Sequence, residues 1–166
     1  MTDGSNIRPG MKPRRAALLA AGLVFIDSLI GQIATFPNLV PWYASLTKPG
    51  FTPPNAVFGP IWTLLYALMA VAFWRILILP EHKGRKLAIG LFLGQLALNV
   101  LWSWAFFAAH SPLLGLIDIL PQAVLIAATL IAFWRLDRLA GLCLLPLLLW
   151  VAYAAALNFA IWRLNG

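Results

Sequence analysis

The sequence predicts an all-α protein, an integral membrane bundle of five transmembrane helices. Three observations lead to this fold class. The 166 residues are 62% hydrophobic with a mean hydropathy of +0.87. Only 10% of them are charged, against about 25% in an average soluble domain. Five apolar runs of about 20 residues, the length that crosses a bilayer, follow one another along the chain. Because hydrocarbon excludes irregular backbone, each run is expected to be a helix.

The elements are expected in the following order. Residues 1–15 are polar and partly basic, so we expect a disordered N-terminal arm, followed by a single membrane domain at 16–166. The first apolar run is about 21 residues long and lacks a clear small-residue cleavage site, so we interpret it as a retained span and not as a signal peptide. The five spans are expected at about 16–36, 57–79, 87–109, 113–134 and 140–164.

A proline-rich segment, residues 37–55, separates the first two apolar runs. Proline fixes φ and removes a backbone donor, so we expect this segment to be stiff and non-helical. Pro60 is expected in the first turn of the second helix, where its missing N–H is no loss. The lone Cys143 can form no internal disulfide.

The basic residues lie between the apolar runs, which argues against nucleic-acid binding despite a net charge of +7. Five crossings place Lys48 and Arg163 on one side of the bilayer and ten basic residues on the other. This bias predicts a cytoplasmic N-terminus and an outward-facing proline-rich loop in a bacterial inner membrane. The ten are Arg8, Lys12, Arg14, Arg15, Arg75, Lys83, Arg85, Lys86, Arg135 and Arg138.

Aromatic and amide side chains form stripes on three of the expected helices, because positions i, i+4 and i+7 share a face. Amides in hydrocarbon turn inward and seek partners, so the stripes are expected to face the bundle interior. Two interpretations stay open at this point, a ligand pocket or interhelical hydrogen bonds without a ligand. The stripes are Trp62, Tyr66 and Met69; Gln95, Asn99 and Trp102; and Trp150, Ala154 and Asn158.

Two carboxylates lie inside expected spans. Asp27, near the centre of the first span, is either functional, for example in a proton relay, or paired with Ser28, Gln32 or an amide of another span. Asp118 lies near the start of the fourth span, where free N–H groups stabilise an anion. The sequence contains no cluster of metal ligands, no Ser/His/Asp set and no glycine-rich phosphate loop, so no metal site and no ordinary enzyme chemistry are expected.

Three stretches resemble the signatures of the translocator protein (TSPO) family, also called tryptophan-rich sensory proteins or peripheral-type benzodiazepine receptors. They are WYASLTKPGFTPPNAVFGPIWTLLYALM, LNVLWSWAFF and LPLLLWVAYAAALNFAIWRLN, which lie within residues 41–165. The resemblance implies a five-helix bundle, usually a homodimer, with a ligand pocket between the helices and the first loop as its lid. It implies no required cofactor. The implied ligands are flat and hydrophobic: porphyrins such as protoporphyrin IX and haem, cholesterol in animal members, and synthetic isoquinoline carboxamides and benzodiazepines.

Residue by residue, the resemblance implies pocket roles for Tyr43, Trp62, Asn99, Trp150 and Ala154, and Trp102 joins them on the stripe of Asn99. Two positions depart from the family pattern. Phe51 stands in the lid where members often have Trp. Phe159 stands where the sterol-recognition pattern needs Tyr, so a porphyrin or stress-response role is favoured over sterol binding.

Three functions are therefore considered. The first is a porphyrin receptor or transporter with a stress or tetrapyrrole-regulation role. The second is a porphyrin-degrading activity that depends on light and oxygen and uses Trp62 and Trp150. The third is a regulatory subunit that acts through helix packing with a membrane partner. The charge bias favours an inner membrane, whereas the resemblance also allows an outer membrane.

Overall fold

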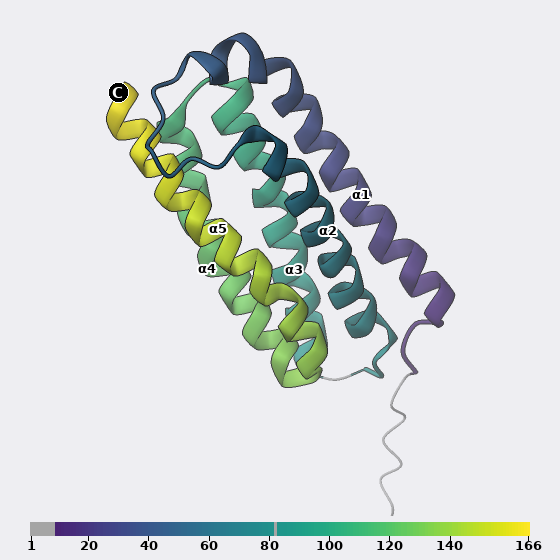
Figure 1. Cartoon of the computed structure of the whole chain (residues 1–166). Helices are drawn as coiled ribbons and strands as arrows, with labels where there is room; N and C mark the ends of the chain where they lie inside the picture. The colour runs from purple at the N-terminus through teal and green to yellow at the C-terminus, as the bar shows by residue number, and fades with distance from the viewer. Residues whose placement is uncertain (1–8, 82) are drawn as a thin grey trace, which may run out of the picture.

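Five long helices form one bundle in the computed structural model, which describes residues 9–81 and 83–166 (Figure 1). The helices are α1 (Pro13–Asn38), α2 (Asn55–Ile78), α3 (Lys83–Ser103), α4 (Pro112–Leu136) and α5 (Arg138–Asn165). No strand occurs in this described part of the chain. Each helix is long and apolar enough to cross a membrane. The predicted fold class is confirmed.

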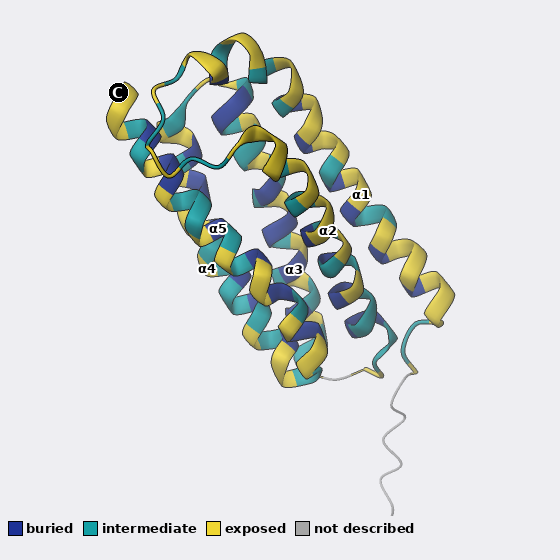
Figure 2. Ribbon diagram, viewed as in Figure 1, coloured by how far each residue is buried: buried dark blue, intermediate teal, exposed yellow. Residues whose placement is uncertain are grey.

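The helices are arranged as a ring. Helix α1 packs against α2 and α3, α4 packs against α3 and α5, and α2 closes the ring by contacting α5. Buried residues face the inside of this ring and exposed residues face its outside (Figure 2). The exposed residues include large apolar ones such as Leu18 and Val124. An exterior of this kind is typical of helices that face lipid.

Four of the five helices are longer than the apolar runs that predicted them, whereas α3 has 21 residues and ends at Ser103 instead of the expected residue 109. Helix α1 begins with Pro13, inside the expected arm, and α3 begins with Lys83. Hydropathy marks only the part of a helix in hydrocarbon, whereas the helix itself continues into the headgroup region, where basic side chains are stable. Pro13 suits its place because the first helical position needs no N–H partner. Residues 1–8 of the expected arm lie outside the described residues.

The proline-rich segment is more helical than predicted. Helix α1 runs through Pro37 to Asn38, and the π-helical turn η1 (Leu39–Tyr43) follows, with a kink at Val40, whose backbone is extended (φ −132°, ψ 130°). Helix α2 begins at Asn55, so irregular backbone is found at Val40 and at residues 46–54. The expectation for Pro60 was also wrong, because it lies in the second turn of α2 and not in the first.

Local contacts explain why these prolines are tolerated. Near Pro37, the side chain of Asn38 donates through Nδ2 to the carbonyl of Ala34 (2.8 Å) and supplies a donor at the weakened end of α1. Before Pro60 stands Gly59, which has no Cβ to clash with the proline ring. At Pro37 and at Pro60 the adjacent residue thus reduces the cost of placing a proline inside a helix.

A second π-helical turn, η2 (Trp104–Ala108), follows α3. A π turn is wider than an α turn and changes which residues share a face. Here it buries two successive aromatics, Phe106 and Phe107, which join Tyr43, Leu157 and Ile161 in a small apolar cluster. This cluster lies beneath the proline-rich segment and shapes one end of the cavity described next.

Candidate ligand-binding cavity

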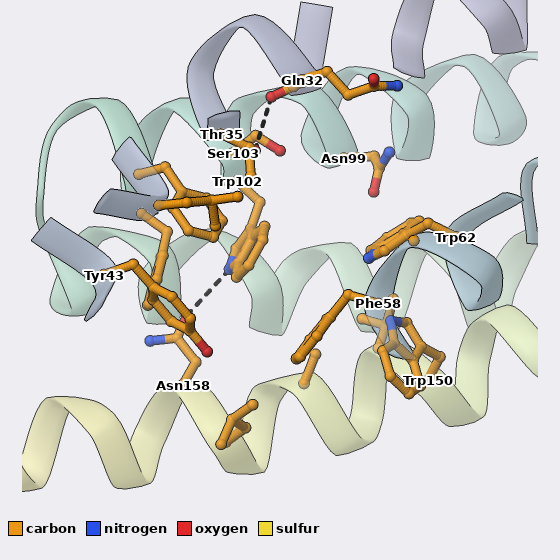
Figure 3. A pocket seen from close by; sticks show the side chains of 18 of the residues that line it. Gln32, Thr35, Tyr43, Phe58, Trp62, Asn99, Trp102, Ser103, Trp150 and Asn158 are labelled. Carbon is orange, nitrogen blue, oxygen red and sulfur yellow. Dashed lines mark hydrogen bonds between the residues drawn. The ribbon is translucent and has the colours of Figure 1, made fainter. Parts of the chain in front are cut away.

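A cavity of about 550 Å³ lies inside the bundle, in the half nearest the proline-rich segment. All five helices contribute lining residues. All six predicted pocket residues line it, several of them shown in Figure 3: Tyr43, Trp62, Asn99, Trp102, Trp150 and Ala154. The structure therefore brings together residues that lie up to 111 positions apart in the sequence, from Tyr43 to Ala154.

Aromatic rings form much of the cavity wall. On α2, the rings of Trp62 and Tyr66 lie 5.3 Å apart with 33° between their planes. Phe58 meets Trp150 of α5 edge to face at 5.7 Å. Rings in such arrangements offer flat apolar surfaces against which another ring can stack. The wall therefore suits a flat hydrophobic molecule.

Trp102 completes the wall and is held in place by its own contacts. Its ring stacks on Phe106 at 5.1 Å and 16°. Its indole N–H donates to Asn158 Oδ1 (3.1 Å), and Asn158 Nδ2 donates to the carbonyl of Pro112 (2.7 Å). Asn158 thus makes interhelical hydrogen bonds, as one of the two interpretations predicted, and it lines the cavity as well.

Asn99 is the centre of a polar network at the cavity floor. Its Nδ2 donates to Asp27 Oδ2 (2.7 Å) and to the hydroxyl oxygen of Tyr66 (3.1 Å). Its Oδ1 accepts from Gln122 Nε2 (3.2 Å). Asp27 is therefore paired with an amide of another span, one of the alternatives left open by the sequence. Because all its partners lie on other helices, the Asn99 amide is held in one orientation.

Two polar residues lie apart from the cavity. Gln95 is fully buried, yet its amide has no hydrogen-bond partner among the described residues. Asp118 lies nearly two turns into α4, too far from the free N–H groups that were expected to stabilise it. Ser111 caps that helix instead, because its Oγ accepts from the backbone N–H of Leu114 (3.2 Å).

The proline-rich segment borders the cavity through Leu39, Tyr43 and Asn55 and is fastened to α5. Asn165 Oδ1 accepts from the backbone N–H of Thr47, and Asn165 Nδ2 donates to the Thr47 carbonyl, both at 2.9 Å. The Tyr153 hydroxyl donates to the carbonyl of Phe51 (2.6 Å). Figure 1 shows this segment running beside the C-terminal end of α5. Phe51, which departs from the family pattern, thus contacts α5 through its carbonyl and its ring.

Sequence reasoning missed several lining residues. Gln122 could have been identified from the sequence, because an amide side chain inside a span is unusual, and Asn99 was identified on that ground. Phe58 lies at the start of the span expected at 57–79, but the stripe identified on that span did not include it. Ser28, Gln32 and Thr63 also line the cavity, although from the sequence the first two were considered only as partners of Asp27.

The cavity is electrically neutral. The described lining residues include no Asp, Glu, Lys, Arg or His, and no Cys or Met. Groups of three or more potential metal ligands are likewise absent from the described part of the chain. Attraction for a ligand here comes from apolar area, ring stacking and uncharged hydrogen-bonding groups.

Comparisons with known proteins agree with this architecture. The sequence model of the TspO/MBR family matches residues 16–163. The chain is 40% identical to the tryptophan-rich protein TspO of Archaeoglobus fulgidus over 158 residues, which cover 90% of this chain and 93% of that protein. It is 39% identical to the tryptophan-rich sensory protein of Cereibacter sphaeroides, in an alignment that covers 75% of this chain and 77% of that protein. It is 38% identical to the translocator protein of Homo sapiens, and that alignment covers 75% of each chain. With five helices able to span a bilayer around one aromatic cavity, this integral multi-pass membrane protein belongs to the TspO/MBR family.

Proposed function

We propose that this protein is a membrane receptor or transporter that binds flat hydrophobic ligands, chiefly porphyrins such as protoporphyrin IX and haem, in the cavity between its helices. The observation that carries the proposal is the convergence of Trp62, Trp102 and Trp150 on one uncharged cavity. The names of the relatives, translocator protein and tryptophan-rich sensory protein, are in keeping with such a role. A function in tetrapyrrole regulation or stress follows from this ligand class.

The cavity suits the chemistry of a porphyrin. Its volume of about 550 Å³ lies within the range of about 300–1,000 Å³ that is usual for ligand sites. The macrocycle would stack on indole rings. The lining offers no His, Cys or Met for a metal at the ring centre, although Tyr43 and Tyr66 line it, so the binding of metal-free protoporphyrin is expected to depend on stacking.

The test is a titration of protein in lipid nanodiscs with protoporphyrin IX, followed by porphyrin fluorescence. The double variant Trp62→Ala, Trp150→Ala should bind at least about tenfold more weakly, because it loses two stacking surfaces. Trp134→Ala is the matched control, since Trp134 is 43% exposed and does not line the cavity. Wild-type affinity in the double variant would contradict the proposed site.

A second candidate function is the light-dependent degradation of bound porphyrin. The observation that favours it is that Trp62 and Trp150 line the same cavity, so both indoles would lie against one ligand. The porphyrin absorption band should then decline only with light and oxygen, and the decline should stop in Trp62→Phe and in Trp150→Phe. An equal rate in these variants would indicate simple photobleaching.

A further inference from the structure

The cavity opens sideways. Among the described residues, every exposed one that lines the cavity belongs to α1 or to the first three turns of α2. The lining residues from α3, η2, α4 and α5 are buried or half-buried. The mouth therefore lies between α1 and α2, along a strip that we call the seam. Its exposed lining residues are Gln32, Phe36, Asn55, Ala56, Gly59 and Thr63.

The seam faces lipid. Large apolar side chains flank it on both helices, with Ile33 of α1 exposed by 65% and Leu64 of α2 by 58%. A molecule that reaches this mouth therefore comes from the bilayer and not from water. This restricts the occupant to something that dissolves in lipid.

Three polar side chains along the seam bond only within their own helix. Gln32 Nε2 donates to Ser28 Oγ (2.7 Å) on its own helix, α1. Thr35 Oγ1 donates to the Gly31 carbonyl (2.8 Å), also within α1, and Thr63 Oγ1 donates to the Gly59 carbonyl (2.9 Å) within α2. Widening the seam breaks none of these three bonds.

The opposite end of the α1–α2 pair is fastened. The backbone N–H of Met11 donates to the Leu77 carbonyl (3.0 Å), and the Trp74 indole donates to the Pro13 carbonyl (3.2 Å). The two helices are thus tied at that end, and the Tyr66 hydroxyl of α2, which hydrogen-bonds with Ser28 of α1, marks the inner limit of the seam. A movement of α1 relative to α2 would therefore widen the gap between these helices at the end that borders the cavity.

The route from the water side, beneath the proline-rich segment that forms the lid, is closed more firmly than the seam. Two hydrogen bonds between Asn165 and Thr47 and one from Tyr153 to Phe51 hold the lid on α5. A ligand that came from the water side would have to break all three. A ligand that came through the seam would leave these three hydrogen bonds intact.

We propose that the seam is a lateral portal through which a flat amphiphile dissolved in the bilayer enters the cavity. The polar edge of the bound molecule then rests against the hydroxyl and amide groups of the seam, while its apolar body lies between the indoles. The polar edge of the ligand finds no such contact at the inner end of the cavity, because the Asn99 amide already has three hydrogen-bond partners. The portal rests on the proposed function, which it extends by an access route and a ligand orientation.

The test blocks the seam without disturbing the fold. Ala56 is an exposed lining residue in the first turn of α2, so Ala56→Trp adds a ring at the mouth without placing a side chain before Pro60. Ala67→Trp is the matched control, because Ala67 is an exposed alanine of the same helix that does not line the cavity. The lid is tested separately with Asn165→Ala, Tyr153→Phe.

The measurement is the association rate of protoporphyrin IX that is already dissolved in the vesicles holding the protein. Ala56→Trp should slow association on the order of tenfold, whereas the Ala67→Trp and lid variants should keep the wild-type rate. Wild-type association in Ala56→Trp, or faster association in the lid variant alone, would overturn the portal. Loss of dimer crosslinking in Ala56→Trp at an unchanged rate would assign the seam to a contact between copies and would overturn it equally.

A pyrene carboxylate, a flat amphiphile unrelated to porphyrins, is measured in parallel. A wild-type protein that binds the pyrene but no porphyrin contradicts the proposed porphyrin function, while the rates with pyrene still test the portal. A wild-type protein that binds neither compound contradicts both. The two proposals therefore fail in different ways.

Discussion

Asn99 is the residue on which the polar interior depends. It is 6% exposed and joins Asp27 of α1, Tyr66 of α2 and Gln122 of α4. Each of these groups would otherwise lie in an apolar interior without this partner, and an unpaired buried polar group is costly. A single amide thus connects four helices at the cavity floor.

Replacing this amide should destabilise the bundle. Asn99→Leu should lower the free energy of unfolding by about 1–3 kcal/mol, because the Asp27 carboxyl and the Gln122 amide lose their partner. The melting temperature in detergent measures this. The exposed Gln32→Leu serves as control and should change stability by less than about 0.5 kcal/mol.

The same network predicts non-additivity. Asp27→Leu combined with Asn99→Leu should cost less than the sum of the two single variants, since the double variant leaves fewer polar groups unpaired. Strict additivity would mean that the 2.7 Å contact between Asp27 and Asn99 contributes nothing to stability.

At the scale of elements, Asp137 joins three helices between α4 and α5. Its Oδ1 accepts from the backbone N–H groups of Leu139 (2.9 Å) and Ala140 (3.1 Å) and so caps α5. Its Oδ2 pairs with Arg75 of α2 at 2.7 Å. Burial alone would raise the pKa of the Asp137 carboxyl, but hydrogen bonds from Arg75 and from the two backbone N–H groups hold it below its usual value of 3.8.

This lowered pKa sets a direction for the pH dependence of stability. The contribution of Asp137 is fully present above its unfolded pKa and is lost as the pH falls through the lower folded pKa. Asp137→Ala should therefore lower stability by about 0.5–2 kcal/mol at pH 7, the usual loss for a helix cap. Melting curves at pH 7 and at about pH 3 should show the difference from wild type shrinking in acid. A difference that grew in acid would contradict the assignment.

At the scale of the whole molecule, charge is distributed unevenly between the two ends of the bundle. The start of α1, the connection from α2 to α3 and the connection from α4 to α5 lie at one end (Figure 1). That end carries all the described basic residues except Lys48 and Arg163. In a bacterial inner membrane such an end stays in the cytoplasm.

Labelling with a membrane-impermeant maleimide tests this orientation in a Cys143→Ser background. Gly50→Cys, in the lid, should be labelled in intact spheroplasts, because Gly50 is exposed and has open space around it. Lys86→Cys should be labelled only after lysis. The reverse pattern would place the lid in the cytoplasm.

The fold class and the inward-facing stripes could be predicted because they depend on local properties. A run of about 20 apolar residues identifies a span on its own, and helical spacing places Trp62, Asn99 and Trp150 on inward faces without reference to any other helix. The helical course through Pro37 was not predicted, because it depends on a side chain of the next residue bonding back one turn.

The sequence by itself determined that this chain crosses a membrane five times and turns aromatic and amide side chains inward. Only the tertiary structure decided that Asn99 pairs with Asp27, that Asn165 fastens the lid at Thr47, and that the cavity opens between α1 and α2. The physical reason is that the first two are contacts between residues 72 and 118 positions apart, and the third depends on how α1 and α2 sit against the rest of the bundle. Such contacts arise from how helices pack against one another, which no local pattern records.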